Sequence, residues 1–216
     1  MNADLTYTQD IVPLVADLLG AADGTVLDLG CGEGQVMRAL PTTTVVGCDW
    51  SGELLTRAAE AGPVVRCRLP DLSWLQSASI AAAYAVLVLE HLPDIDRFFA
   101  EAARVVRSGG ALVLVQNHPA YTPPGAGPII DQTDGEILWR WGSYFDETSG
   151  REPAGQGWIT FYHRPFAQLL SAAATAGWCL ERAVEHGLSL DAVARDPGMS
   201  GQEHMPRILG LRWVNH

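Results

Sequence analysis

Apolar and polar positions along the first half of the chain follow two alternating periods, one typical of helices and one of strands. Residues 8–19 carry apolar side chains at three- and four-residue spacing and are followed by Gly20, which predicts a first helix. Short apolar or β-branched runs, predicted as strands, follow at residues 25–30, 44–49, 64–69, 83–89 and 111–117. The intervening stretches with helical spacing are residues 34–40, 52–61 and 95–106. Because each crossover has to return the chain to start another parallel strand, this alternation predicts an α/β fold, a doubly wound and mostly parallel sheet with helices on both faces.

Residues 118–163 break this rhythm. They contain PPGAGP, GEILWRWGSYF and REPAGQGW, and the segment is too long for an ordinary connection between two elements. The spacing beyond it predicts a helix at residues 166–176 and strands at residues 178–185 and 207–214. We therefore expect a single domain over residues 1–216, in which residues 118–165 form an aromatic-rich lid after the fifth strand.

The composition narrows the choice of partner. The chain has 216 residues, 48% of them hydrophobic, which is enough for one ordinary core. Its formal net charge of −11 repels phosphate backbones, so we expect no nucleic-acid partner and no anionic membrane surface. All 14 basic residues are arginine, which excludes lysine Schiff-base chemistry and a Walker A phosphate loop. A small-molecule partner is favoured, and the sequence leaves the oligomeric state open.

Neither a metal site nor an export signal is expected. The four cysteines are far apart and three of them fall in apolar runs, so they are interpreted as small buried hydrophobes rather than a disulfide framework or a zinc cluster. Histidines and acids show no metal-ligand spacing. The N-terminus has no basic segment followed by an apolar stretch, and later apolar runs are too short or too interrupted to cross a bilayer. The expected location is the reducing cytoplasm, in soluble form.

The stretch VLDLGCGEG, residues 26–34, carries the strongest chemical signal. Gly30, Gly32 and Gly34 follow the first predicted strand, where the chain has to turn sharply and let a ligand approach the backbone. Their spacing is not the G-x-G-x-x-G of a dinucleotide site, and Asp28 lies just before the turn. A carboxylate disfavours a diphosphate but favours an ammonium group. The ligand that combines adenosine, an amino-acid zwitterion and a cationic sulfonium without phosphate is S-adenosylmethionine.

Two further acids follow the second and third predicted strands. Asp49 is suited to accept both ribose hydroxyls, although the same residue would serve NAD. Asp71 is suited to accept from the adenine amino group, with Trp50 and Leu72 on either side of the ring. The competing interpretation is that Asp49 and Asp71 cap the helices that follow them. Three acids at the ends of three successive strands favour the cofactor interpretation, because ligands of such sheets bind at those ends.

With these motifs the sequence resembles the class I S-adenosylmethionine-dependent methyltransferases, which have a Rossmann-like fold. The resemblance covers roughly residues 8–117 and rests on VLDLGCGEG, VVGCDWS, PDLSW, VLVLEHLPDIDRF and RVVRSGGALVLV. It implies Gly30 and Gly32 at the methionine portion, Asp49 on the ribose, and the Leu89 backbone near the amino group. The same resemblance implies Asp71 with Leu72 at the adenine and a seven-stranded sheet whose last strand is antiparallel. The SGG at residues 108–110, where relatives often have PGG, affects only a turn.

The lid segment is the expected acceptor site. Its aromatic residues suit a cover over a small apolar or aromatic acceptor, and ordinary packing is the alternative for each of them. The candidates for acceptor contact are Tyr121, Trp139, Trp141, Tyr144 and Tyr162.

Methyl transfer from a sulfonium is a direct displacement that mainly requires alignment and exclusion of water. A base helps only when the nucleophile carries a proton. His118 directly follows the fifth strand and His163 begins the return to the sheet, so these two are the candidate bases, with a structural role as the alternative. His91 is expected to orient the loop after the fourth strand, with Glu90 nearer the cofactor.

Three rival functions stay open at the level of sequence. An NAD-dependent oxidoreductase is disfavoured by the glycine spacing and by Asp28. A regulatory protein that binds the cofactor without catalysis is compatible with the fold, because fold does not dictate function. A nucleic-acid methyltransferase is disfavoured by the net charge and by LEHLPD, where adenine-modifying relatives carry a D/N-P-P-Y/F motif. The acceptor, and whether its oxygen, nitrogen, sulfur or carbon is methylated, cannot be predicted.

Overall fold

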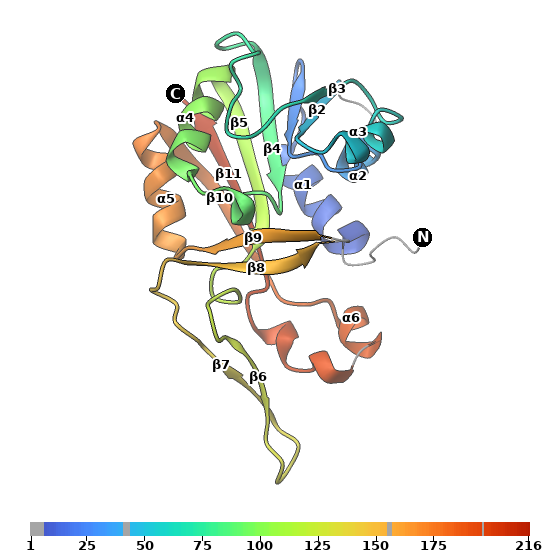
Figure 1. Ribbon diagram of the computed structural model, residues 1–216, viewed down its shortest axis with the longest axis vertical. Helices are drawn as coiled ribbons and strands as arrows, with labels where there is room; N and C mark the ends of the chain where they lie inside the picture. The colour runs from blue at the N-terminus through green and yellow to red at the C-terminus, as the bar shows by residue number, and fades with distance from the viewer. Residues whose placement is uncertain (1–6, 41–43, 155–156, 196) are drawn as a thin grey trace.

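A seven-stranded sheet forms the centre of the computed structural model, which describes residues 7–40, 44–154, 157–195 and 197–216 (Figure 1). The strand order is β10-β11-β5-β4-β1-β2-β3. The strands are β1 Val26–Leu29, β2 Val45–Asp49, β3 Val64–Arg66, β4 Ile80–Val86, β5 Val106–Asn117, β10 Trp178–His186 and β11 Ile208–Asn215. Neighbouring strands from β3 to β5 pair in parallel, whereas β11 is antiparallel to both β5 and β10. The predicted doubly wound, mostly parallel sheet is confirmed.

Helices cover both faces of this sheet, as Figure 1 shows. The helices are η1 Tyr7–Ile11, α1 Val12–Leu19, α2 Gln35–Ala39, α3 Gly52–Ala58, η2 Leu89–His91, α4 Ile95–Val105 and α5 Phe166–Thr175. Successive residues of β1 point to opposite faces, so that Leu27 joins the core cluster under α4 and α5 and Val26 joins the cluster under α1, α2 and α3. Burial of the strand on both faces explains its uninterrupted apolar pattern.

Two helix starts are fixed by side chains that accept a backbone hydrogen bond. The Asp94 carboxylate accepts from Arg97 N–H at 2.9 Å and begins α4. At α3 the capping group is the Ser51 hydroxyl, which accepts from Leu54 N–H at 3.4 Å. The alternative interpretation of Asp49 as the cap of this helix is therefore wrong, and its carboxylate has other partners.

Strands β4 and β5 begin earlier than the apolar runs predicted. β4 starts at Ile80 and β5 at Val106, and the pairing register shifts between Ile80 and Ala82. The first residues of β5 include exposed polar side chains and glycine, which carry no strand period. Gly110 is required within β5, because an added Cβ would lie 2.5 Å from the Ala81 carbonyl oxygen.

The predicted lid segment folds as two antiparallel hairpins, a feature that the sequence analysis did not anticipate. They are β6 Gly127–Ile130 with β7 Ile137–Arg140, and β8 Thr148–Ala154 with β9 Gly157–His163. In Figure 1 the β8–β9 hairpin crosses beneath the carboxyl ends of the sheet strands, while the β6–β7 hairpin projects away from the body.

The return from β10 to β11 contains short elements that the sequence analysis did not anticipate. They are α6 Leu190–Arg195, η3 Pro197–Met199 and η4 Gln202–His204. None of the helices in the described ranges is both long and apolar enough to span a bilayer.

Candidate active site

The glycine turn after β1 presents bare backbone at the carboxyl end of the sheet. Gly30, Gly32 and Gly34 all have positive φ, at 81°, 54° and 81°. At Gly30 an added Cβ would lie 2.5 Å from a Val88 methyl carbon, so this glycine is required for packing. At Gly32 an added Cβ would meet nothing within 4 Å, so its backbone borders open space. The turn thus leaves room where the sequence predicted a ligand.

Asp49 links this turn to the start of α3. Its carboxyl oxygens accept from Gly32 N–H at 3.0 Å and from Ser51 N–H at 2.8 Å. Each oxygen has a second lone pair available to a further donor. Trp50, the next residue, is 67% exposed, while its carbonyl accepts from the Arg66 guanidinium at 3.0 Å. The structure therefore brings Gly32, Asp49 and Trp50 together, as predicted for one ligand site.

Asp28 lies deeper than expected. Its side chain is only 3% exposed, and on the neighbouring strand it is paired in register with Tyr84. Burial raises the pKa of Asp28 to about 7, and the Asp49 carboxylate adds to the rise. The buried Tyr84 hydroxyl lies close to Asp28 without reaching hydrogen-bond geometry in this structure. Burial also raises the pKa of Tyr7 in η1, with Asp28 as the next cause. The Asp28 carboxyl group thus lies buried beneath the turn and not on its rim.

The loop after β3 separates two residues that were predicted to act together. Asp71 is exposed, and hydrogen bonds from Ser73 lower the pKa of its carboxylate. Leu72 is only 1% exposed and belongs to the core under α4. Its N–H donates to Glu101 at 3.3 Å and its carbonyl accepts from Arg104 at 2.9 Å. The structure does not bring the Leu72 side chain to the surface near Trp50, so its contact with adenine stays a prediction.

Glu90 lies at the carboxyl end of β4, within η2. The carboxylate is buried, and its Oε1 accepts from Asn117 N–H at 2.9 Å and from Asn117 Nδ2 at 2.8 Å. Burial raises the pKa of Glu90 although these two hydrogen bonds oppose the rise. Within the described part of the chain, Glu90 Oε2 and the buried Gln116 Oε1 have no hydrogen-bond partner. The preceding Leu89 carbonyl accepts from Arg164 at 3.0 Å.

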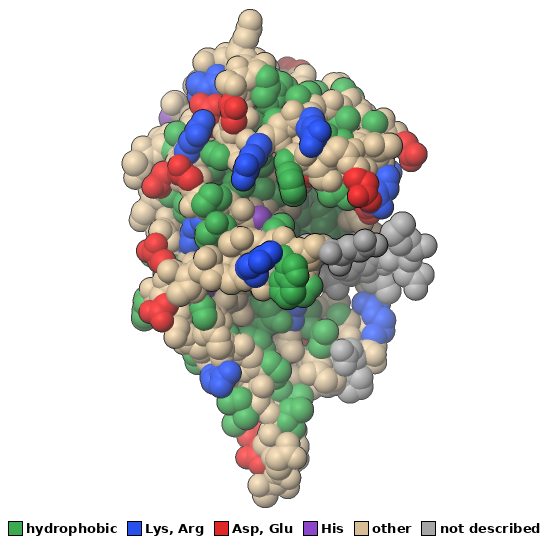
Figure 2. All heavy atoms as spheres, viewed as in Figure 1, with side chains coloured by type: hydrophobic (Ala, Val, Ile, Leu, Met, Phe, Trp, Pro, Cys, Tyr) green, Lys and Arg blue, Asp and Glu red, His purple; other side chains and the backbone are tan. Residues whose placement is uncertain are grey.

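A small, partly open cavity of about 10 Å³ lies at the carboxyl ends of β4 and β5. Its lining comes from these two strand ends, from the lid segment and from α5, and consists of Leu89, Glu90, Gln116, Asn117, Pro119, Thr122, Tyr162, Arg164 and Leu169. On the face drawn in Figure 2, hydrophobic side chains also surround a larger hollow immediately above the β8–β9 hairpin. The carboxyl ends of the strands are therefore a hollowed edge of the sheet.

Both candidate bases have their ring nitrogens engaged. His118 Nδ1 accepts from Ala120 N–H at 3.0 Å, and its Nε2 donates to Glu185 at 2.7 Å. Burial lowers the pKa of His118, and the Glu185 carboxylate opposes this. His163 Nε2 donates to the Tyr144 carbonyl at 2.9 Å, which leaves Nδ1 as the partner of the Thr122 hydroxyl at 3.1 Å. Neither ring has a free lone pair in this conformation, and a role as base stays a prediction for both.

The predicted aromatic contacts fall into two groups. Tyr121 stacks on Trp139 at 5.1 Å and lies 3.8 Å beneath the Arg207 guanidinium, in a packed cluster. The Tyr144 hydroxyl accepts from the N–H of Phe166 at 2.9 Å and thereby ties the lid to α5. These three aromatic residues take part in packing.

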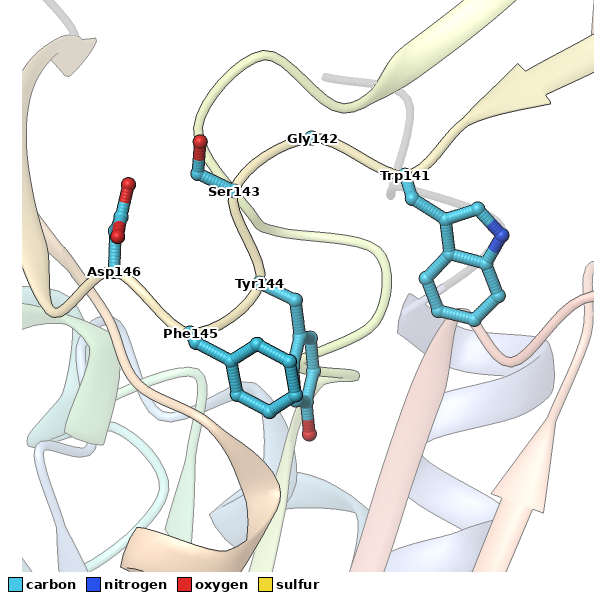
Figure 3. A pocket seen from close by; sticks show the side chains of 6 residues that line it. All are labelled: Trp141, Gly142, Ser143, Tyr144, Phe145 and Asp146. Carbon is cyan, nitrogen blue, oxygen red and sulfur yellow. The ribbon is translucent and has the colours of Figure 1, made fainter.

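Two further predicted aromatic residues border open space. Tyr162 lines the small cavity. Trp141 is 64% exposed and borders an open recess of about 430 Å³ made by residues 141–146. Figure 3 shows the rings of Tyr144 and Phe145 side by side, with the Trp141 indole apart from them.

The sequence analysis placed Glu90 near the cofactor but predicted neither Glu90 nor Gln116 as an acceptor-site residue. The available signal was an acidic residue at the end of a fully apolar run, in VLVLEH, and an amide at the end of the next run, in LVLVQN. Polar residues that end two adjacent parallel strands meet at one edge of the sheet. Histidine is the commoner general base, so the sequence favoured the two lid histidines for this role.

Comparisons with known proteins point in one direction. A family model described as a methyltransferase domain matches residues 27–114. The chain is 30% identical over 173 residues to a trans-aconitate 2-methyltransferase of Variovorax paradoxus, with 71% of this chain and 65% of that protein covered. It is 38% identical over 95 residues to a trans-aconitate 2-methyltransferase of Azoarcus sp., with 42% of this chain and 38% of that protein covered. The chain thus spans between about two fifths and two thirds of the length of these curated relatives.

A solved structure extends the likeness over nearly the whole chain. The crystal structure of an S-adenosylmethionine dependent methyltransferase from Mesorhizobium loti is 26% identical to this chain, with a TM-score of 0.79. The match covers 94% of this chain and 96% of that one. Because the family model ends at residue 114, this match extends the likeness to sequence that lies beyond that model.

Proposed function

This chain belongs to the class I S-adenosylmethionine-dependent methyltransferases, and from that premise we propose that it methylates a small molecule by direct displacement. The observation that carries the proposal is the hydrogen bond from Gly32 N–H to Asp49 beside the exposed Trp50. It joins a bare backbone surface, a carboxylate and an aromatic ring at one edge of the sheet. A cationic nucleoside without phosphate fits these three features together, because a diphosphate would face the carboxylate.

The residues present suit the cofactor. When bound, S-adenosylmethionine supplies an electrophilic methyl group on a sulfonium. Asp49 is proposed to accept from the ribose hydroxyls through its remaining lone pairs, and Trp50 to stack on the adenine. Gly30 and Gly32 are proposed to border the methionine portion, with Asp28 beneath them. Asp71 and Leu89 keep their proposed places at the adenine and the amino group, and Gly34 starts the helix that supports the turn.

For the acceptor we propose an apolar or aromatic small molecule. Tyr162 lines the cavity at the sheet edge, and Trp141 and Phe145 expose apolar rings on the lid. Arg164 is the one arginine among the described residues that line this cavity, and its guanidinium already donates to the Leu89 and Leu92 carbonyls. Trans-aconitate, the carboxylate in the names of two relatives, would require a cation that is not already engaged. The arrangement therefore favours a less charged acceptor.

His118 and His163 remain candidate bases only with a movement of the lid. For either ring to take a proton, the hydrogen bond from Ala120 N–H or from the Thr122 hydroxyl has to break. Such an opening is compatible with the motions of lids over methyl acceptors, which also exclude water during the reaction.

Calorimetry with S-adenosylmethionine, S-adenosylhomocysteine and NADH tests the proposal. We expect uptake of the first two ligands and none of NADH. Asp49→Asn should lower the affinity for S-adenosylmethionine about 10- to 100-fold, because one charged acceptor becomes a neutral amide. Asp23→Asn, at an exposed position away from the turn, serves as the matched control and should bind normally. Tight binding of NADH with indifference to both sulfur ligands would overturn the proposal.

A further inference from the structure

We propose that Glu90 is the catalytic residue that accepts the proton of the methyl acceptor, and that the acceptor's nucleophile is a neutral hydroxyl or amine. This inference rests on the proposed methyl transfer and adds the reacting group of the substrate. The nucleophilic oxygen or nitrogen of the methyl acceptor, which carries this proton, would enter the small cavity between Glu90 and Gln116.

The position of Glu90 suits such a contact. It lies in η2, shortly after the end of β4, and β4 lies between β1 with its glycine turn and β5 with its lid connection. Two N–H donors from Asn117 hold Oε1 and fix the orientation of the carboxyl group. Oε2 has no partner within the described residues, although the side chain is only 5% exposed. A buried carboxylate oxygen without a donor is costly, so it indicates a missing donor.

Gln116 supplies the second unpaired oxygen. Its side chain is 4% exposed and lines the same cavity, and its Oε1 also lacks a donor in the described structure. The cavity volume of about 10 Å³ suits one group the size of water, which is also the size of a hydroxyl or an amino group. Two hydrogen-bond acceptors around a space of this size require a hydrogen-bond donor between them. A carboxylate on the methyl acceptor would instead place further lone pairs and a second negative charge beside Glu90.

The other charged and titratable groups near Glu90 are engaged elsewhere. Arg164 lines the cavity and donates to the Leu89 and Leu92 carbonyls. The ring of His91, next to Glu90 in η2, is hydrogen-bonded through Nδ1 to the Thr160 carbonyl at 3.1 Å. The Tyr162 ring lies 5.1 Å from the Arg164 guanidinium. Glu90 is accordingly the one carboxylate among the described residues that line this cavity.

The proton transfer balances without a further reactant. Glu90 Oε2 takes the proton of the acceptor's O–H or N–H while a lone pair of that atom forms the bond to the methyl carbon. The electron pair of the broken carbon–sulfur bond stays on sulfur. The products are the methylated acceptor, the neutral thioether S-adenosylhomocysteine and a protonated Glu90, which returns its proton to water when the lid residues open. Burial raises the pKa of Glu90, which makes its ionised form a stronger base than an ordinary carboxylate.

A binding experiment tests the acceptor class without turnover. The protein saturated with S-adenosylhomocysteine is titrated with three probes of matched shape, 4-methylphenol, 4-methylaniline and 4-methylbenzoate. We expect the phenol or the aniline to bind at least 10-fold more tightly than the benzoate, and which of the two binds distinguishes oxygen from nitrogen acceptors. Glu90→Gln should abolish this discrimination. Glu53→Gln, in an exposed glutamate of α3, is the matched control and should preserve it.

Turnover with the bound probe gives a second readout. Glu90→Gln should lower the rate of methyl transfer at least 100-fold, with Glu90→Asp intermediate, while the affinity for S-adenosylmethionine is unchanged. In the wild type the rate should rise with pH as Glu90 ionises, and this rise should be absent in Glu90→Gln. Should Glu90→Gln fail to fold, Gln116→Met removes the other unpaired oxygen and should weaken phenol or aniline binding about 5-fold.

The outcomes separate the two proposals. Equal binding of the benzoate, discrimination that survives in Glu90→Gln, or no binding of any probe to the loaded wild type would each overturn the role of Glu90. A failure of S-adenosylhomocysteine itself to bind would instead overturn the proposed function.

Discussion

The sheet and the lid segment differ in how their structure is determined. Residues of β1 are buried on both faces and pair with strands on either side. The β6–β7 hairpin pairs only with itself among the described elements, and Ile129, Ile130 and Leu138 remain exposed on it. An isolated two-stranded hairpin is marginally stable in water. We therefore expect the cofactor half of the proposed site to be rigid and the lid's contribution to the acceptor half to be adaptable.

The largest expected effect of a single substitution is in the core beneath α4. Phe99 is fully buried, contacts Trp213 edge-on at 5.5 Å and offers its carbonyl to the Trp178 indole at 3.0 Å. Phe99→Ala should lower the free energy of unfolding by about 3–5 kcal/mol, because it leaves a cavity that a packed core cannot close. Denaturation in urea measures the loss. A loss of unfolding free energy below about 1 kcal/mol would show that the sheet core is not more rigid than the lid segment.

The second effect is a pH dependence that originates beneath the glycine turn. Burial raises the pKa of Asp28 from 3.8 to about 7, so the folded state holds a proton that the unfolded state has released. Stability is therefore greatest below about pH 4 for this group and falls as the pH rises through 7, by up to about 1.4 kcal/mol per pH unit. Glu90, whose pKa is also raised, contributes in the same direction.

Asp28→Asn should make this pH slope shallower, because the amide does not titrate. Unfolding free energies between pH 4.5 and 7.5 measure the slope, and Asp23→Asn controls for the loss of one surface charge. An unchanged slope in Asp28→Asn would mean that this carboxyl group keeps an ordinary pKa. It would then lie nearer to solvent than a buried position beneath the glycine turn.

The same contrast explains which parts of the structure could be predicted. The strand and helix periods of residues 8–117 gave the order of elements, because burial on both faces of a parallel sheet leaves a direct mark on the sequence. Gly32, Asp49 and Trp50 could be predicted as neighbours, since successive parallel strands end at the same edge.

Contacts between distant segments could not be predicted in this way. Glu101 and Arg104 of α4 hold the backbone of Leu72, and no local sequence pattern predicts these hydrogen bonds. The β6–β7 hairpin had a usable signal in Asp134-Gly135, where Gly135 has φ 79° and the turn chemistry is typical of hairpins. The apolar residues of its two strands are few and exposed, so burial leaves no long apolar run of the kind that predicted the sheet strands.

A smaller effect is expected where the lid joins the sheet layers. Tyr144→Phe removes the hydroxyl that accepts from Phe166 N–H at the start of α5, and should cost about 1 kcal/mol of unfolding free energy. Hydrogen exchange at the Phe166 amide should quicken locally. Tyr121→Phe, which keeps the ring between Trp139 and Arg207, is the control and should leave that amide unchanged. Equal exchange of the Phe166 amide in both variants would show that the Tyr144 hydroxyl does not hold the lid to α5.

The smallest expected effect on stability is at the tip of the recess. Phe145 is 85% exposed, so Phe145→Ser should change the free energy of unfolding by less than about 0.5 kcal/mol. The Phe145 ring contacts the Tyr144 ring edge-on at 5.2 Å and otherwise faces the open recess of residues 141–146. We therefore expect Phe145→Ser to raise KM for an aromatic acceptor several-fold while the affinity for S-adenosylmethionine is unchanged, as initial rates and calorimetry would measure. A loss of stability comparable to that of Phe99→Ala would instead make the lid a second core, and the division between a rigid cofactor layer and an adaptable acceptor segment would no longer hold.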